Sequence, residues 1–149
     1  MISKKTKYAL IALSQLAESH GSKKPVLISE VAERGRIPKK FLEAILLELK
    51  NDGLLLSRKG PGGGYRLAKA PEQIVLGQVL RLLEGPLAPL PCASRTAYRK
   101  CEECVDEHTC PIRMVMTEVR DAMAGVLDDT TLADMAEKGK LQATGMYFI

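Results

Sequence analysis

Hydrophobic residues in the first third of the chain recur every three or four positions, which is the spacing of helices that bury one face. A first helix is predicted over residues 6–19, with its apolar face formed by Leu10, Leu13, Leu16 and Ala17. A short second helix is expected to begin at the N-cap candidate Ser29 and to stop at Gly35. Pro38 fits the first turn of a third helix that runs to residue 51, with inward-facing residues at Phe41, Leu42, Ile45, Leu46 and Leu49. Two short helices joined by a turn that contains Gly predict a helix-turn-helix.

The pattern changes to two short extended runs after residue 53. Residues 54–58 and 65–68 predict two strands, and the glycine-rich run 60–64 predicts the turn of a hairpin between them. Consecutive glycines let backbone amides approach a polyanion, and Arg58, Lys59 and Arg66 supply charge for phosphates or a narrow minor groove. We therefore interpret the hairpin as the wing of a winged helix. A nucleotide-binding loop is disfavoured, because the Gly-Lys-Ser/Thr ending of a P-loop is missing and no helix follows the glycines directly.

Helical spacing returns in the second half of the chain. Residues 76–84 predict a helix that the prolines after it cannot continue. Pro111 opens a longer helix whose apolar residues alternate in four- and three-residue steps, at Ile112, Met116, Val119, Met123 and Val126. Such a heptad seam predicts a helix-pairing surface, and a plain intramolecular core stripe is the alternative. Because the core is small, we favour pairing with a second copy, which makes the protein a homodimer.

These elements predict a mainly α fold with a small β-hairpin wing, in which a long dimerisation helix follows a winged helix-turn-helix domain. The predicted DNA-binding domain spans residues 1–85, a cysteine-rich loop residues 86–110, the dimerisation helix and a short terminal helix residues 111–138, and a flexible tail residues 139–149. The terminal helix is expected from Thr131 through Met135. No apolar run approaches the roughly 18 residues of a membrane span, and the N-terminus lacks a signal-peptide core. We expect a cytoplasmic protein without membrane contact.

The charge distribution is compatible with nucleic acid as the partner. The net charge is +4, and basic residues concentrate in the N-terminal half while acidic residues lie among the cysteines. At the start of the third helix, Lys39 and Lys40 can bind guanine or phosphate, and Glu43 can accept from cytosine N4; a merely solvated face is the alternative. Lys5 and Lys7 are candidate phosphate contacts. The expected wing contacts to double-stranded DNA are Arg58, Lys59, Gly60, Pro61, Gly62, Gly63 and Tyr65.

The chain has four cysteines, all in one polar stretch, at Cys92, Cys101, Cys104 and Cys110. A disulfide scaffold would spread its cysteines through the fold, and a reducing cytosol favours metal ligation or redox sensing. Four thiolates match a 2Fe-2S or 4Fe-4S cluster, and zinc accepts the same set tetrahedrally. Zinc fingers usually add a second close pair, so the isolated position of Cys92 favours an iron-sulfur cluster over zinc. A cluster-free site that responds by thiol oxidation stays open, and His108 is interpreted as a solvated loop residue rather than a ligand.

The cysteine loop also admits two other classes of function. The pair Cys101 and Cys104, with two glutamates between, has the spacing of a thiol oxidoreductase centre, but the carboxylates disfavour the thiolate form and no strand-to-helix context precedes the pair. We therefore expect no enzyme. A metal-binding adaptor that acts only through protein contacts is the remaining alternative, and DNA binding that ignores sequence would favour it.

Motifs along nearly the whole chain resemble the IscR-like (iron-sulfur cluster regulator) family of bacterial winged-helix transcription regulators. The most specific is the Gly-Pro-Gly-Gly-Gly-Tyr wing of residues 60–65; the others lie at residues 42–48, 53–54, 76–77, 84–86 and 130–134. Members of this family are dimers, and many hold a 2Fe-2S or 4Fe-4S cluster. The resemblance implies a sequence-specific regulator of a palindromic operator, whose DNA affinity is controlled by an iron-sulfur cluster in the 92–110 loop.

Position by position, the resemblance makes the helix from Pro38 the recognition helix and the helix from Pro111 the dimerisation helix. It also makes Cys92, Cys104 and Cys110 the best-matching cluster ligands. The chain departs from the family pattern at three positions: Cys101 is an additional thiol, Arg113 stands where some relatives have a histidine ligand, and Lys59 replaces the usual arginine before the wing glycine. The first two departures leave the fourth ligand open.

Overall fold

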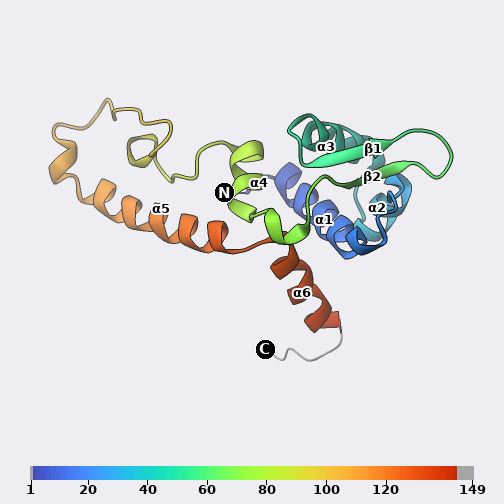
Figure 1. The fold of residues 1–149 in the computed structure, drawn as a ribbon. Helices are drawn as coiled ribbons and strands as arrows, with labels where there is room; N and C mark the ends of the chain where they lie inside the picture. The colour runs from blue at the N-terminus through green and yellow to red at the C-terminus, as the bar shows by residue number, and fades with distance from the viewer. Residues whose placement is uncertain (1, 144–149) are drawn as a thin grey trace. The chain divides into compact units, whose positions relative to one another are not determined.

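The computed structural model describes residues 2–143, which form two compact units (Figure 1). The first unit contains the chain up to Val75 and from Thr131 onward, and the second contains Leu76–Thr130. This division differs from the predicted boundary at residue 85, because the fourth helix packs with the long helix of the second unit and the last helix packs with the first unit. Within residues 2–143 no helix is long and apolar enough to cross a bilayer.

The first unit is built from α1 (Lys4–Glu18), α2 (Ile28–Gly35), α3 (Lys39–Asn51) and α6 (Leu132–Ala143), with short 3-10 turns at His20–Ser22 and Pro71–Gln73. Its core is aliphatic, as the pattern of apolar residues predicts. The largest fully buried side chains are Leu13, Leu16, Val31, Leu42, Ile45, Leu46, Leu49, Leu54, Leu55, Leu67, Ile74 and Leu132. The three helices α1, α2 and α3 therefore share one core with the hairpin and with the first turn of α6.

Several helix ends differ from those predicted. The backbone carbonyl of Leu27 accepts the first hydrogen bonds of α2, from Glu30 and Val31, so Leu27 and not Ser29 is the N-cap. Pro38 likewise lies just before α3, where its carbonyl accepts from the Leu42 amide at 2.9 Å. α6 continues past Met135, because Leu132 and Ala136 bury one face of the helix in the first unit. Part of the predicted tail is thus helical, and residues 144–149 lie outside the described part of the chain.

Phe41 was predicted to face inward, and this prediction was wrong. Its side chain is 41% exposed, because it lies beside the stripe of α3 that faces the core and not within it. The ring instead meets the ring of Tyr8 on α1 edge to face, with centroids 5.6 Å apart. The contact joins the beginnings of α1 and α3 at the surface.

The hairpin pairs β1 (Leu55–Arg58) with β2 (Gly64–Leu67) in antiparallel register, so that Leu55 lies opposite Leu67. The turn requires glycine at its end. A side chain at Gly63 would collide with the carbonyl of Arg58, and one at Gly64, where φ is 149°, would collide with the carbonyl of Val26. Val26 occupies that position because its backbone pairs with Tyr65 in both directions. The predicted winged helix-turn-helix is therefore confirmed, with mainly helical structure and a two-stranded hairpin.

The second unit contains α4 (Leu76–Glu84), 3-10 turns at Pro91–Ala93 and Glu107–Thr109, and α5 (Pro111–Asp129). Figure 1 shows the segment between α4 and α5 running back beside α5. The guanidinium of Arg81 on α4 donates to both carboxylate oxygens of Asp128 on α5, at 2.7 and 2.9 Å. Gly77 permits this pairing, because a side chain there would displace the Asp128 carboxylate.

Asp128→Asn is expected to weaken the α4–α5 contact at neutral pH by at most about 1 kcal/mol, because both partners are substantially exposed to solvent. Hydrogen bonding to Arg81 lowers the pKa of Asp128, so the pair stabilises the fold above the ordinary carboxyl pKa of about 3.9 and loses this effect as pH falls through the lowered pKa. Urea unfolding at several pH values should therefore show a difference from wild type that vanishes in acid. Asp129→Asn, an exposed neighbour, is the control, and a difference independent of pH would contradict the assignment.

Candidate nucleic-acid interface and cysteine site

The helix-turn-helix presents α3 with its polar side outward. The turn between α2 and α3 is made by Arg36, in the left-handed region with φ of 52°, and by the buried Ile37. Burial of the opposite side of α3 leaves Lys39, Lys40 and Glu43 exposed on its first two turns. These are the side chains that the sequence predicted as contacts to base edges and phosphates. Their exposure and position at the helix start suit insertion into a major groove.

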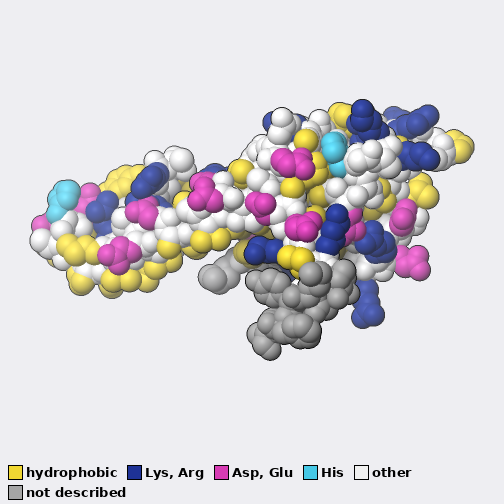
Figure 2. Space-filling model, turned by 60° about the horizontal axis from the view of Figure 1, so that its bottom comes forward, with side chains coloured by type: hydrophobic (Ala, Val, Ile, Leu, Met, Phe, Trp, Pro, Cys, Tyr) yellow, Lys and Arg dark blue, Asp and Glu magenta, His cyan; other side chains and the backbone are white. Residues whose placement is uncertain are grey.

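The hairpin carries an exposed basic tip. Arg58, Lys59 and Arg66 are exposed, together with the turn residues Gly60, Pro61 and Gly62. Figure 2 shows Lys and Arg side chains gathered at the end of the first unit where the hairpin projects. An exposed, positively charged loop of this kind can contact the sugar-phosphate backbone.

The backbone amides of two predicted wing contacts, Gly63 and Tyr65, already form hydrogen bonds within the protein. The Gly63 amide donates to the Gly60 carbonyl at 2.9 Å, and the Tyr65 amide donates to Val26 at 2.9 Å. Their backbone N–H groups are therefore committed to the turn and the strand pairing and are not available to phosphates. The sequence could not reveal the pairing of Tyr65, because Val26 is distant from it in the chain, whereas the Gly63 bond lies within the local turn.

Of the two lysines predicted as phosphate contacts at the start of α1, Lys7 is exposed and Lys5 is half-buried. Lys5 forms an ion pair with Glu48 of α3. This pair links α1 to α3, and a phosphate contact by Lys5 would compete with it. Ser3 caps α1 through its hydroxyl, which accepts from the Thr6 amide at 3.2 Å.

The four cysteines are free thiols in the second unit, and they differ in burial. Cys92 is buried in the turn Pro91–Ala93, Cys101 is exposed, and Cys104 and Cys110 are half-buried. Cys110 is the N-cap of α5, where its sulfur accepts from the Arg113 amide at 3.5 Å. Partial burial and the proximity of the Cys110 and Cys101 sulfurs raise the pKa of the Cys104 thiol. Cys104 therefore lies near both of these cysteines.

The predicted four-thiolate site is not assembled in the structure. Within residues 2–143 no three His, Cys, Asp or Glu side chains converge closely enough to hold a metal ion. The donor chemistry nevertheless fits iron or zinc, since all four groups are soft thiols in one loop. Metal ligation requires deprotonated thiols, so a bound cation would offset the repulsion between the resulting thiolates. His108 is exposed in this loop, as its interpretation as a solvated residue predicts.

Two arginines of α5 hold the Cys92 turn against that helix. The Arg113 Nε donates to the Cys92 carbonyl at 3.1 Å, and one heptad later an Arg120 Nη donates to the Ala93 carbonyl at 2.7 Å. Arg120 is only 14% exposed, and hydrogen bonding to its guanidinium lowers the pKa of the adjacent Asp121. Arg113, noted in the sequence only as a departure from a ligand position, is thus a backbone clamp. The role of Arg120 was missed, and only its seven-residue spacing from Arg113 could have suggested it.

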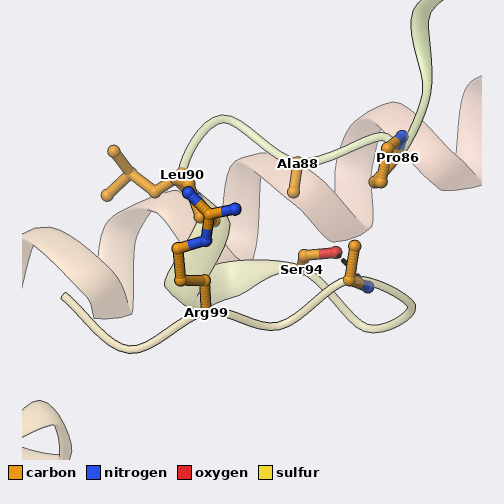
Figure 3. A pocket seen from close by; sticks show the side chains of 7 residues that line it. Pro86, Ala88, Leu90, Ser94 and Arg99 are labelled. Carbon is orange, nitrogen blue, oxygen red and sulfur yellow. Dashed lines mark hydrogen bonds between the residues drawn. The ribbon is translucent and has the colours of Figure 1, made fainter.

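A pocket of about 290 Å³ lies beside this turn and is lined by Pro86, Ala88, Leu90, Pro91, Ser94, Ala97 and Arg99 (Figure 3). Inside it the Ser94 hydroxyl accepts from the Ala97 amide at 2.9 Å, which closes the loop after Cys92. None of its lining residues is a cysteine. The pocket is therefore separate from the thiols.

α5 presents an apolar stripe to solvent. Every side chain from residue 111 to 129 is half-buried or exposed, and of the predicted seam Ile112, Val119 and Val126 are exposed while Met116 and Met123 are half-buried. Val115 and Ala122 are also exposed and complete a second heptad series, in which the steps are again three and four residues. Figure 2 shows a band of hydrophobic side chains along this unit. The exposed series therefore contains Val115 and Ala122 where the predicted seam has Met116 and Met123. The two methionines are half-buried because they border the side of α5 that packs within the unit.

A helix-turn-helix with a basic hairpin and a cysteine-bearing helical extension defines a winged-helix regulator of transcription. Residues 2–138 match the model of the Rrf2 family, described as an iron-dependent transcriptional regulator, and the chain belongs to this family. The resemblance to IscR-like regulators is confirmed, and the relatives are named as regulators rather than enzymes.

Three relatives illustrate the similarity. The rrf2-like HTH-type transcriptional regulator of Rhodobacter capsulatus is 45% identical over 141 residues, which cover 93% of this chain and 94% of that protein. The structure of CymR (YrzC), the global cysteine regulator of B. subtilis, has a TM-score of 0.77 and 33% identity, covering 93% of this chain and 97% of CymR. The structure of T. potens IscR has a TM-score of 0.72 and 32% identity, covering 93% and 88%.

Proposed function

We propose that this regulator binds a palindromic DNA operator as a homodimer and that an iron-sulfur cluster held by the cysteines of residues 92–110 controls its DNA affinity. The DNA-binding part of this proposal rests on one observation. Lys40 and Glu43 are exposed on the outer side of α3, in a unit that also contains a basic hairpin. Lysine can bind guanine or phosphate, and glutamate can accept from cytosine. Sequence recognition is thus assigned to α3 and phosphate binding to the wing.

The exposed apolar series of α5 supports the homodimer. Ile112, Val115, Val119 and Val126 are each more than a third exposed, and the steps of three, four and seven residues suit pairing with an identical helix. A two-fold dimer places two recognition helices on half-sites of a palindrome. The operator is therefore expected to be an inverted repeat.

For the cluster, Cys92, Cys104 and Cys110 are the proposed ligands, and Cys101 is the candidate for the fourth position. When bound, an iron-sulfur cluster supplies a centre that responds to oxidation by a change of charge or by loss. The protein residues that respond are Arg113 and Arg120, which tie the Cys92 turn to α5, and Cys110, which caps the same helix. Reordering of the loop would thereby move α5, which continues through Thr130 and Thr131 into α6 on the DNA-binding unit.

A cluster-free regulator that uses zinc or thiol oxidation is the second candidate. It is favoured by the similarity to CymR, which is named as a cysteine regulator. Iron and zinc content of protein purified without oxygen distinguishes the two candidates. A metal-binding adaptor would instead show no sequence preference for DNA.

Binding curves on a selected operator at several salt concentrations test the DNA-binding assignment. Arg58→Ala or Lys59→Ala should weaken binding to all sequences similarly and reduce the salt slope by about one unit per lost phosphate contact. Glu43→Ala should change preference at one base pair per half-site by roughly 1–3 kcal/mol, with the slope nearly unchanged. Lys138→Ala, an exposed lysine of α6, is the matched control. If wild-type protein with and without its metal prefers no sequence over random DNA, the adaptor takes the place of the regulator.

A further inference from the structure

The outer side of α3 carries an apolar pair beside its charged residues. Lys40, Glu43, Ala44 and Leu47 follow the spacing i, i+3, i+4, i+7, which places them on one side of a helix, and all four are exposed. Leu47 is 50% exposed. The buried residues Leu42, Ile45, Leu46 and Leu49 lie on the opposite side, so Leu47 points away from the core.

The charged residues near the apolar pair Ala44 and Leu47 indicate which kind of partner this surface binds. Lys39, Lys40, Arg58 and Lys59 are exposed on the same unit and favour a polyanion over an apolar protein surface. In the major groove the apolar feature of a base edge is the 5-methyl group of thymine, which alanine and other apolar side chains contact. The spacing of the four residues is also that of the base-contacting positions of a homeodomain recognition helix.

We propose that Ala44 and Leu47 recognise thymine methyl groups in the major groove, beside the cytosine that Glu43 recognises. This inference rests on the proposed role of α3 as the recognition helix. Glu43 and Leu47 are four residues apart, which corresponds to about 6 Å along a helix axis. For a helix aligned with the groove, this length spans about two base-pair steps of about 3.4 Å. Each half-site should thus contain a thymine within about two positions of the base pair read by Glu43.

Deoxyuridine substitution tests the proposal, because it removes the methyl group and nothing else. The operator is first selected from random DNA with the wild-type protein, and each thymine is then replaced singly by deoxyuridine in both half-sites. Wild-type affinity should fall about fourfold per half-site at one or two positions, the value expected when about 0.8 kcal/mol of methyl burial is lost. The Leu47→Ala protein should bind the thymine and deoxyuridine operators equally at the position that Leu47 contacts. The Ala44→Ser protein should bind them equally at the position that Ala44 contacts.

Because Leu47 is half-exposed on a helix surface, Leu47→Ala is expected to leave the fold intact, and thermal unfolding checks this. Leu82→Ala, an equally sized change at an exposed leucine of α4, is the matched control and should retain the deoxyuridine effect. Equal wild-type binding to all thymine and deoxyuridine operators would overturn the proposal while leaving the Glu43 assignment intact. A methyl effect that survives both α3 substitutions would also overturn it. Absence of any sequence preference would instead refute the proposed function itself.

Discussion

Cys92→Ala, Cys104→Ala and Cys110→Ala are each expected to abolish the visible absorption and bound iron of protein purified without oxygen. Thiolate-to-iron charge transfer gives a cluster its brown colour, and removal of one of three family-matched ligands leaves too few thiolates to retain it. Cys92 is buried in a turn held by α5 and Cys110 caps that helix, so these two proposed ligands are fixed to the protein frame. Absorption spectra and metal analysis of the three variants and wild type give the result directly.

Two variants of the same loop serve as controls. His108→Ala should keep the colour, because His108 is an exposed loop residue and not a proposed ligand. Cys101→Ala distinguishes a three-cysteine site completed by another group from a four-cysteine site, since only the latter loses its iron. A colourless wild-type protein with one zinc per chain would refute the cluster, while the DNA-binding assignment would stand.

Val119→Lys is expected to convert the dimer into monomers and to lower palindrome affinity by about a hundredfold or more. Val119 lies at the centre of the exposed apolar series of α5, and a dimer would bury two unpaired ammonium groups there, at a cost of about 3–5 kcal/mol. Met116→Lys should act in the same direction, but Met116 is half-buried and also borders the packing within the unit. Val119→Lys is therefore the cleaner change.

Sedimentation and operator binding measure this effect together. Glu118→Lys adds a lysine at the adjacent exposed position outside the apolar series and should remain dimeric. A wild-type protein that sediments as a monomer would end the homodimer proposal. A dimeric Val119→Lys would move the interface away from this side of α5.

Local sequence determined the parts of the fold that depend on neighbours in the chain. The three helices of the DNA-binding unit follow from apolar residues at helical spacing, and the wing follows from the run of glycines that forms its tight turn. The grouping of the thiols follows from their positions alone. Each of these features is encoded within a window of a few turns, where periodicity and turn chemistry decide the structure.

Tertiary contacts decided the rest, because they join residues that are far apart in the chain. Helical periodicity alone could not show that Phe41 meets Tyr8 at the surface, that Val26 occupies the Tyr65 amide, or that α6 returns to pack on the first unit. The clamp of Arg113 and Arg120 on the turn at Cys92 and Ala93 spans more than 20 residues, so no local pattern contains it. Packing within the second unit also determines which side of α5 is exposed. A seven-residue repeat predicts an apolar stripe, but it does not predict which residues of the stripe are buried against the rest of the chain.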